Sequence, residues 1–213
     1  MGKIPEFVRM NGWYLLIDEV FARIGATARG TTLNRRLGTK GLRLGPGSYI
    51  RGLGCMKIGA DVHAGRGLWL QAITRYRDQR FTPRIVIGDS VRISHYVHIA
   101  ATHYVEIGDH CLFGSKALVT DHNHGQYTAT YSSPNVPPSL RALDNDRSVK
   151  IGRNVWIGDG VVIGPGANIG EGCIVGANSV VRGSLPPFSI SSGNPATVFK
   201  KYDFDRQEWI GSE

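Results

Sequence analysis

The chain has little of what marks several large protein classes. Its three cysteines are odd in number and far apart, which provides no disulfide framework and fits a reducing compartment. No apolar run is long enough to cross a bilayer, and no apolar leader with a cleavage site opens the sequence, so we expect a cytoplasmic protein. A GxxxxGK[ST] loop and nucleic-acid-binding motifs are also absent, so neither a P-loop phosphate site nor a nucleic-acid partner is expected.

Positive charge, in contrast, is in excess. The 213 residues carry a formal net charge of +8 with a pI near 9.6, and this length suits one domain with small appendages. A basic balance favours an anionic partner. Because nucleic-acid motifs are absent, a membrane surface or a phosphorylated small molecule is the better match.

An aliphatic residue returns every six positions between residues 147 and 185. A glycine follows it five times of six, and the residue four positions after the aliphatic one is mostly small or apolar. Helices do not repeat every six residues, whereas short strands joined by tight turns do. The repeat therefore predicts a β-solenoid, in which each coil buries its inward residues against the next. The aliphatic positions are Ile151, Ile157, Ile163, Ile169, Val175 and Val181.

The same period appears upstream, at 87–100 and 107–120, and then stops. Residues 125–149 have no repeat and include three prolines. A long unpatterned insertion in a compact repeat is usually functional or disordered. The stretch Thr120–Gly125 stands directly before the insertion and holds two histidines, so we look for chemistry at this interruption.

Four stretches, taken with the hexads, resemble a known family. They are VTDHNHG at 119–125, NVWIGDGVVIGPG at 154–166, IVGANSVV at 174–181 and GNPATVFKK at 193–201. The chain resembles the hexapeptide-repeat acyltransferases, and within them the O-acetyltransferases of lipopolysaccharide and exopolysaccharide synthesis. This resemblance implies an all-β fold, a left-handed parallel β-helix, assembled as a homotrimer with its active sites between subunits.

Three segments are expected on this basis. Residues 1–40 form an N-terminal helical segment, and residues 41–198 form the parallel β-helix, into which the loop 125–149 is inserted. Residues 199–213 form a short C-terminal helical tail.

The N-terminal segment departs from the β pattern, because six apolar residues fall on one helical face. We favour a helix packed on the end or side of the solenoid. The alternative is an interfacial helix that lies on a membrane, helped by nearby arginines. The apolar residues are Trp13, Leu16, Ile17, Val20, Phe21 and Ile24, and the arginines are Arg9, Arg23, Arg29, Arg35 and Arg36.

A second irregular stretch runs from Trp69 to Arg84. It holds Tyr76 among several arginines. A solvated loop is the simpler interpretation, and contact with an anionic acceptor is the other.

The resemblance makes His122 the general base. A histidine suits this role near neutral pH. His122 is expected to take a proton from a sugar hydroxyl as that oxygen attacks the thioester of acetyl-CoA. Weaker expectations place Asp121, Asn123, His124 and Tyr96 in contact with the acceptor. The acceptor is a saccharide, either lipid-linked or nucleotide-linked.

By the same resemblance, the later coils bind the donor. The pantetheine arm of acetyl-CoA is expected in a groove between adjacent coils of two subunits, and two lysines are expected to meet the nucleotide phosphates. The residues assigned to the donor are Trp156, Asp159, Gly176, Ala177, Arg182, Lys200 and Lys201.

Two other functions remain open from the residues. His98 and His103 are compatible with a β-helix hydratase of the γ-carbonic-anhydrase kind, which uses histidines of adjacent coils as zinc ligands. A non-catalytic solenoid binding module is the second alternative, although it has no use for the long loop. If the chain is an acyltransferase, we expect it to need no metal ion.

Overall fold

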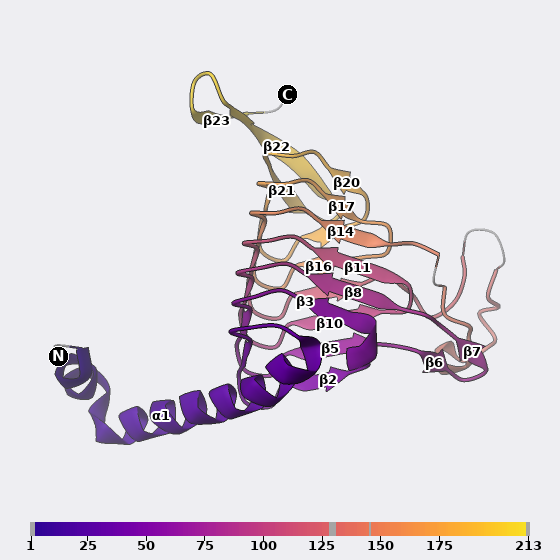
Figure 1. Cartoon of the computed structure of the whole chain (residues 1–213). Helices are drawn as coiled ribbons and strands as arrows, with labels where there is room; N and C mark the ends of the chain where they lie inside the picture. Colours follow the sequence, from indigo (N-terminus) through magenta and orange to yellow (C-terminus); the bar gives the residue numbers. More distant parts are fainter. Residues whose placement is uncertain (1–2, 128–130, 145, 212–213) are drawn as a thin grey trace.

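A computed structural model describes residues 3–127, 131–144 and 146–211 as a stack of coils with one long helix at its N-terminal end (Figure 1). The chain winds repeatedly through three sheets, here called faces A, B and C, in that order. Face A comprises β1 (Arg43–Leu44), β4 (His63–Ala64), β9 (Arg92–Ile93), β12 (Leu112–Phe113), β15 (Trp156–Ile157), β18 (Ile174–Val175), β21 (Ser189–Gly193), β22 (Ala196–Asp203) and β23 (Glu208–Gly211). Face B comprises β2 (Tyr49–Arg51), β5 (Trp69–Ala72), β10 (His98–Ala101), β13 (Leu118–Thr120), β16 (Val162–Ile163) and β19 (Val180–Val181). Face C comprises β3 (Met56–Ile58), β8 (Arg84–Ile87), β11 (Tyr104–Ile107), β14 (Val149–Ile151), β17 (Asn168–Ile169) and β20 (Ser184–Leu185).

The six-residue repeat explains the core. Most strands of the stack turn at least one aliphatic residue inward, and parallel pairing stacks these residues in register, as in the series Ile107, Ile151 and Ile169 on face C. The small residues four positions later, such as Cys111 and Cys173, are also buried. The predicted solenoid is therefore confirmed, with the core along the axis of the stack.

The glycine after each aliphatic residue allows consecutive coils to approach closely. At Gly158, a Cβ atom would lie 2.6 Å from the backbone nitrogen of Ala177 on the next coil. A side chain at this position would therefore push two coils apart.

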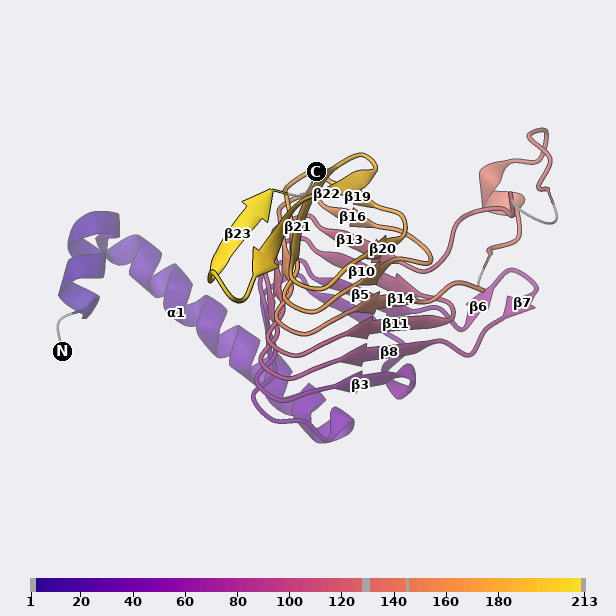
Figure 2. The same cartoon turned by 90° about the horizontal axis from the view of Figure 1, so that it is seen from above.

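The N-terminal helix α1 (Lys3–Leu37) covers the solenoid only with its last turns. Leu33 and Leu37 pack on the core, and the Asn34 side-chain oxygen accepts the backbone N–H of Leu42 at 3.1 Å. The rest of α1, interrupted by non-helical backbone at Gly12, projects away from the stack (Figures 1 and 2). No helix among the described residues is long and apolar enough to cross a membrane.

The expectation that the apolar face of this helix packs on the solenoid is wrong for most of its length. Trp13 is 68% exposed and Phe21 is 69% exposed, and Ile17, Val20 and Ile24 are also exposed. The side chains of Leu16, Arg23 and Arg29 lie outside the described residues. The helix runs outward from the end of the stack, so its N-terminal turns have no surface of this chain beneath them (Figure 2).

The helical tail expected at 199–213 is also wrong, because β22 and β23 form an antiparallel hairpin there. Aromatic residues of strand type pack within it, with Tyr202 edge-on to Trp209 at 5.2 Å between ring centroids. The Asp203 side chain accepts the backbone N–H groups of Asp205 and Arg206, which fixes the turn between the strands. Residues 212–213 lie outside the described part of the chain.

Candidate active site

Two insertions leave the solenoid at the same edge, between face B and face C. The hairpin of β6 (Arg75–Tyr76) and β7 (Gln79–Arg80) separates β5 from β8, and the long loop separates β13 from β14. Both extend to the same side of the stack (Figures 1 and 2). His122 lies at the beginning of the long loop and thus on this B/C edge.

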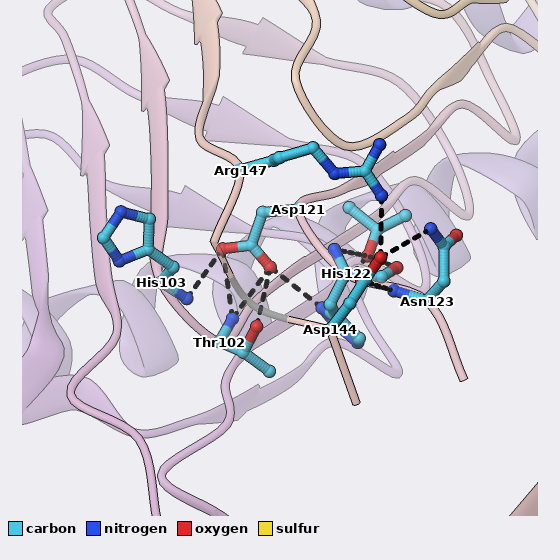
Figure 3. Close-up of polar contacts among 8 residues, drawn as sticks. Thr102, His103, Asp121, His122, Asn123, Asp144 and Arg147 are labelled. Atoms are coloured by element: carbon cyan, nitrogen blue, oxygen red, sulfur yellow. Dashed lines mark hydrogen bonds and ion pairs between the residues drawn. The ribbon is translucent and has the colours of Figure 1, made fainter. Parts of the chain in front are cut away.

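Asp121 orients the imidazole of His122. Its Oδ1 atom lies 2.9 Å from His122 Nδ1 (Figure 3). The Thr120 hydroxyl lies 3.2 Å from the same nitrogen. The Asp121 carboxylate also accepts the backbone N–H groups of Thr102 and His103, at 2.9 and 2.8 Å, and the Thr102 hydroxyl at 3.1 Å. The carboxylate is fully buried.

These contacts favour the ionised form of Asp121. Burial alone would raise the pKa of Asp121, but the hydrogen bond from His122 and the backbone N–H groups of Thr102 and His103 outweigh it, so the pKa is lowered. An ionised carboxylate only accepts hydrogen bonds, so Nδ1 of His122 carries the proton. Nε2 of His122, which has no hydrogen-bond partner within the described residues, is then free to accept a proton.

The sequence predicts that Asp121 contacts the acceptor. The structure does not place it for such a contact. Its side chain is 0% exposed, and donors from Thr102, His103 and His122 surround its two oxygens. Its contact with His122 holds the imidazole in place.

Asn123 holds the base of the long loop together. Its backbone N–H donates to Asp144 at 2.6 Å, and its side-chain amide donates to the same carboxylate at 3.3 Å. Arg147 completes the group with an ion pair of 2.7 Å to Asp144 (Figure 3). The loop thus returns to the solenoid through a bonded neck, although its residues 128–130 and 145 lie outside the described part.

The β6–β7 hairpin braces this loop and also contacts His124. The Tyr76 hydroxyl donates to the Ser139 carbonyl at 2.7 Å and lies 3.2 Å from His124 Nδ1. Gln79 exchanges two hydrogen bonds with the backbone of Leu143, at 2.7 and 3.1 Å. The irregular stretch 69–84 is therefore not a free solvated loop.

A groove on face A contains most of the residues assigned to the donor. It has a volume of about 440 Å³ and lies along consecutive coils at the edge between faces A and B. Its walls include Trp156, Asp159, Gly176 and Ala177. Trp156 is half exposed, whereas the Asp159 side chain accepts the backbone N–H of Ser115 and so also ties two coils together.

The two lysines extend the same face. Trp156 pairs with Ile174, Ile174 with Ile190, and Ile190 with Lys200 across the closing hairpin. Lys200 is thus three strand spacings from Trp156, about 14 Å. Lys200 and Lys201 are both exposed, and they lie on this sheet beyond the groove.

Arg182 and Tyr96 lie elsewhere. Arg182 follows β19 on the B/C edge and does not line the groove. Tyr96 is exposed in a turn between faces A and B, in the left-handed region with φ of 56°. His122 and the groove therefore occupy opposite edges of face B in one chain.

Comparisons with known proteins agree with this architecture. The family "Bacterial transferase hexapeptide (six repeats)" matches residues 148–183, and "Hexapeptide repeat of succinyl-transferase" matches residues 104–120. WbbJ of Escherichia coli strain K12, which bears the name lipopolysaccharide biosynthesis O-acetyl transferase, is 42% identical over 163 residues, 76% of this chain and 79% of WbbJ. This chain belongs to the hexapeptide-repeat acetyltransferases.

Solved structures of this family have the same fold. A hexapeptide-repeat acetyltransferase of Vibrio cholerae, complexed with acetyl-CoA, aligns with a TM-score of 0.52 and 25% identity over 82% of this chain and 77% of its own. AntD, an N-acyltransferase from Bacillus cereus in complex with dTDP and 3-hydroxybutyryl-CoA, aligns with a TM-score of 0.60 and 21% identity over 79% and 84%. The expectation of an acyltransferase is confirmed.

His98 and His103, which are candidate zinc ligands from the sequence, make other contacts in the structure. His98 stacks on Trp69 at 4.6 Å, and burial, with a smaller effect of His122, lowers its pKa. His103 contributes its backbone N–H to Asp121. Within the described ranges, no three His, Cys, Asp or Glu side chains are arranged to hold a metal ion.

Sequence reasoning missed Thr102, Tyr76 and Asp144 as neighbours of the histidine stretch. Thr102 was visible as a two-residue irregularity between hexad blocks, which marks the turn that Asp121 binds. Tyr76 and Asp144 lie in unpatterned insertions, where no period predicts which residues meet.

Proposed function

We propose that this protein moves the acetyl group of acetyl-CoA to a hydroxyl of a saccharide in surface polysaccharide or lipopolysaccharide synthesis. The observation that carries the proposal is the Asp121–His122 pair on the B/C edge. Membership in the hexapeptide-repeat acetyltransferases and the name of WbbJ support the O-acetyl transfer. The bound acetyl-CoA of the Vibrio cholerae structure supports the donor.

His122 acts as the general base in this reaction. Its Nε2 takes the proton of the acceptor hydroxyl while that oxygen attacks the thioester carbonyl. The tetrahedral intermediate then collapses, the carbon–sulfur bond breaks, and the CoA thiolate takes the proton back from Nε2. Asp121 keeps Nδ1 protonated throughout and stabilises the imidazolium that forms between the two steps.

The site is completed between two subunits of a homotrimer of left-handed β-helices. His122 lies on the B/C edge and the donor groove on the A/B edge, so one chain keeps base and donor apart across face B. If the B/C edge of one subunit meets the A/B edge of the next, three copies close around an axis and bring both together. Face B of each subunit then turns toward that axis.

The chemistry of face B supports this arrangement. Face B has two outward columns in register, and the one beside the A/B edge is aromatic or aliphatic at five of six positions: Tyr49, Trp69, His98, Leu118, Val162 and Val180. The corresponding column of face C is mostly polar: Lys57, Val86, Glu106, Lys150, Asn168 and Ser184. Interfaces between subunits favour the more apolar face.

The exposed apolar side of α1 supports a peripheral contact with the inner face of the cytoplasmic membrane. Trp13, Phe21 and Ile24 are suited to insertion at a lipid surface, and the net charge of +8 favours anionic lipids. Flotation with vesicles containing an anionic lipid should recover the wild-type protein. A Phe21→Glu variant should remain unbound, and equal recovery of both proteins would contradict the contact.

The activity is tested by thiol release. The protein is incubated with acetyl-CoA and a panel of nucleotide sugars, lipid-linked sugars and glycan fragments, and free CoA is measured. Thiol release that depends on both a saccharide and His122 is expected. Release unchanged in His122→Ala, or absent with every saccharide tested, would contradict the proposed function.

A further inference from the structure

A small cavity lies on the same edge as His122, near the N-terminal end of the stack. It has a volume of about 170 Å³ and opens between β2, β5 and the start of the hairpin. Two arginines and one amide are among its walls, which are formed by Arg51, Gly52, Gln71, Ala72, Ile73, Thr74 and Arg75. None of these residues was assigned a role in acetyl transfer.

The pairing of face B fixes the distance from this cavity to the base. Thr120 pairs with Ala100, Ala100 with Gln71, and Gln71 with Arg51, so all four lie in one outward column beside the B/C edge. With adjacent strands about 4.8 Å apart, Gln71 is about 10 Å and Arg51 about 14 Å from Thr120, the residue that contacts His122. A hexose ring and one linking group fit this span.

The polar side chains that line the cavity provide hydrogen-bond donors, and none of the lining residues is acidic. Arg51 is exposed and makes no hydrogen bond or ion pair with the described residues. The Gln71 side-chain oxygen accepts the indole N–H of Trp69 at 2.9 Å, which leaves its NH₂ group as a donor. Arg75 uses Nε to bind the Arg77 carbonyl at 3.0 Å and keeps its terminal nitrogens.

The hairpin adds further positive charge beside the cavity. Arg75 stands directly opposite Arg80 across the two strands, on one face of the hairpin. Like charges in this position repel each other, and neither arginine has an ion-pair partner in the described part of the chain. A bound anion would relieve this repulsion, so the charge pattern favours a polyanionic ligand.

We propose that this cavity binds the diphosphate of an acceptor whose sugar is attached to a diphosphate group, with Arg51, Arg75 and Gln71 as its ligands. The assignment rests on the proposed acetyl transfer, because the span to Thr120 places the attached sugar at His122. Arginine binds phosphate oxygens with paired, charge-assisted hydrogen bonds. A nucleoside diphosphate sugar and a polyprenyl diphosphate sugar share this group.

The test is a calorimetric titration of the full chain with inorganic pyrophosphate. Saturating CoA is present, so that the phosphate site of the donor is occupied. Arg51→Ala and Arg75→Ala should each weaken pyrophosphate binding about 10- to 100-fold, because each removes hydrogen bonds to a charged ligand. Arg43→Ala is the matched control, since Arg43 is also an exposed arginine of the lower coils but lies on face A, away from the cavity.

Binding that is unchanged in both cavity variants, or weakened equally in Arg43→Ala, would overturn the site. Titrations with UDP, dTDP and farnesyl diphosphate distinguish the source of the diphosphate. Tighter binding of a nucleoside diphosphate than of pyrophosphate indicates a nucleotide-linked acceptor, and tighter binding of farnesyl diphosphate indicates a lipid-linked one.

Thiol release with uncharged glycosides, measured in parallel, separates this inference from the proposed function. Turnover with glycosides, together with pyrophosphate binding that ignores Arg51 and Arg75, would overturn only the diphosphate site. Pyrophosphate binding that depends on these arginines, together with no thiol release from any acceptor, would overturn the acetyl transfer.

Discussion

Asp121 Oδ1 lies 2.9 Å from His122 Nδ1, and the same carboxylate binds the backbone of Thr102 and His103. The group that orients the imidazole is therefore also the group that joins the histidine stretch to the preceding coil. Burial of the carboxylate removes water as a competitor for these donors. The orientation of the imidazole and the contact between the two coils at this corner depend on one side chain.

His122→Ala should lower turnover by about a hundred- to ten-thousand-fold, the usual contribution of a positioned general base. Binding of acetyl-CoA should change little, because His122 does not line the donor groove, whose walls are formed by other residues. The rise of kcat with pH through one ionisation should vanish in the variant. His124→Ala is the control and should be milder, since Nδ1 of His124 contacts the Tyr76 hydroxyl rather than Asp121. A larger loss in His124→Ala than in His122→Ala would reassign the base.

Asp121→Asn should reduce kcat and leave the KM for acetyl-CoA near its wild-type value. An amide at this position can donate a hydrogen bond to Nδ1 of His122. The imidazole would then carry its proton on Nε2, the atom that must accept the proton of the acceptor hydroxyl. Turnover of Asp121→Asn at the wild-type level would show that the tautomer of His122 does not depend on this contact.

The same substitution has a consequence for stability at acid pH. The pKa of Asp121 is lowered from 3.8 in the folded protein, so its contribution is fully present above pH 3.8 and is lost as the pH falls through the lowered value. The difference in unfolding free energy between wild type and Asp121→Asn should thus be constant at neutral pH and shrink below pH 3.8. Denaturant titrations at several pH values measure it, and a difference that grows on acidification would have the wrong sign.

Much of the fold was predictable because each hexad specifies its own coil. The aliphatic residue must point inward, the glycine permits the close approach of the next coil, and neither requirement depends on distant residues. Residues 199–213 carried no such local period, and the β22–β23 hairpin depends on a turn at Asp203 that the helical prediction overlooked. The exposure of α1 likewise depends on where the solenoid ends beneath it, which hydrophobic spacing does not report.

The roles that the sequence assigns to His122 and to the groove residues stay predictions, whereas the structure buries Asp121, which was assigned to the acceptor. Its real partners, Thr102 and His103, are 19 and 18 residues away in sequence and become neighbours only when coils stack. The contact between Tyr76 and His124 spans 48 residues and joins two insertions, neither of which has a period. Spacing within one motif cannot predict such pairs.

Tyr76→Phe should loosen the long loop and lower kcat modestly. The change removes the hydrogen bond to the Ser139 carbonyl and the contact with His124 Nδ1, each worth about 1 kcal/mol. The unfolding temperature should be nearly unchanged, because the core coils are untouched. Replacing residues 125–148 with a short Gly-Ser linker, which keeps the core residue Val149, should have a larger effect on turnover. Unchanged turnover in the linker variant would mean that the loop plays no part in catalysis.

Changing Lys200 and Lys201 together to alanine should weaken binding of CoA more than binding of a pantetheine fragment that lacks the nucleotide. Both lysines are exposed and lie about 14 Å along face A from Trp156, beyond the groove assigned to the pantetheine arm. The affinity of the wild type for CoA should fall with added salt, since exposed charges are screened. Equal losses for CoA and the fragment would indicate an effect on the closing hairpin instead.

Val162→Asp should dissociate the trimer and abolish turnover, although Val162 does not line the donor groove and is not part of the histidine stretch. If face B turns toward a threefold axis, the substitution places three carboxylates near one another in a dehydrated interface, which is strongly unfavourable. Asn168→Asp is the matched control, because Asn168 is the outward residue of a two-residue strand on face C and adds the same charge outside the proposed interface. Light scattering after size exclusion should give a trimeric mass for wild type and Asn168→Asp and a monomeric mass for Val162→Asp. A Val162→Asp protein that remained trimeric and fully active would remove face B from the interface and, with it, the meeting of His122 and the groove of a neighbouring subunit.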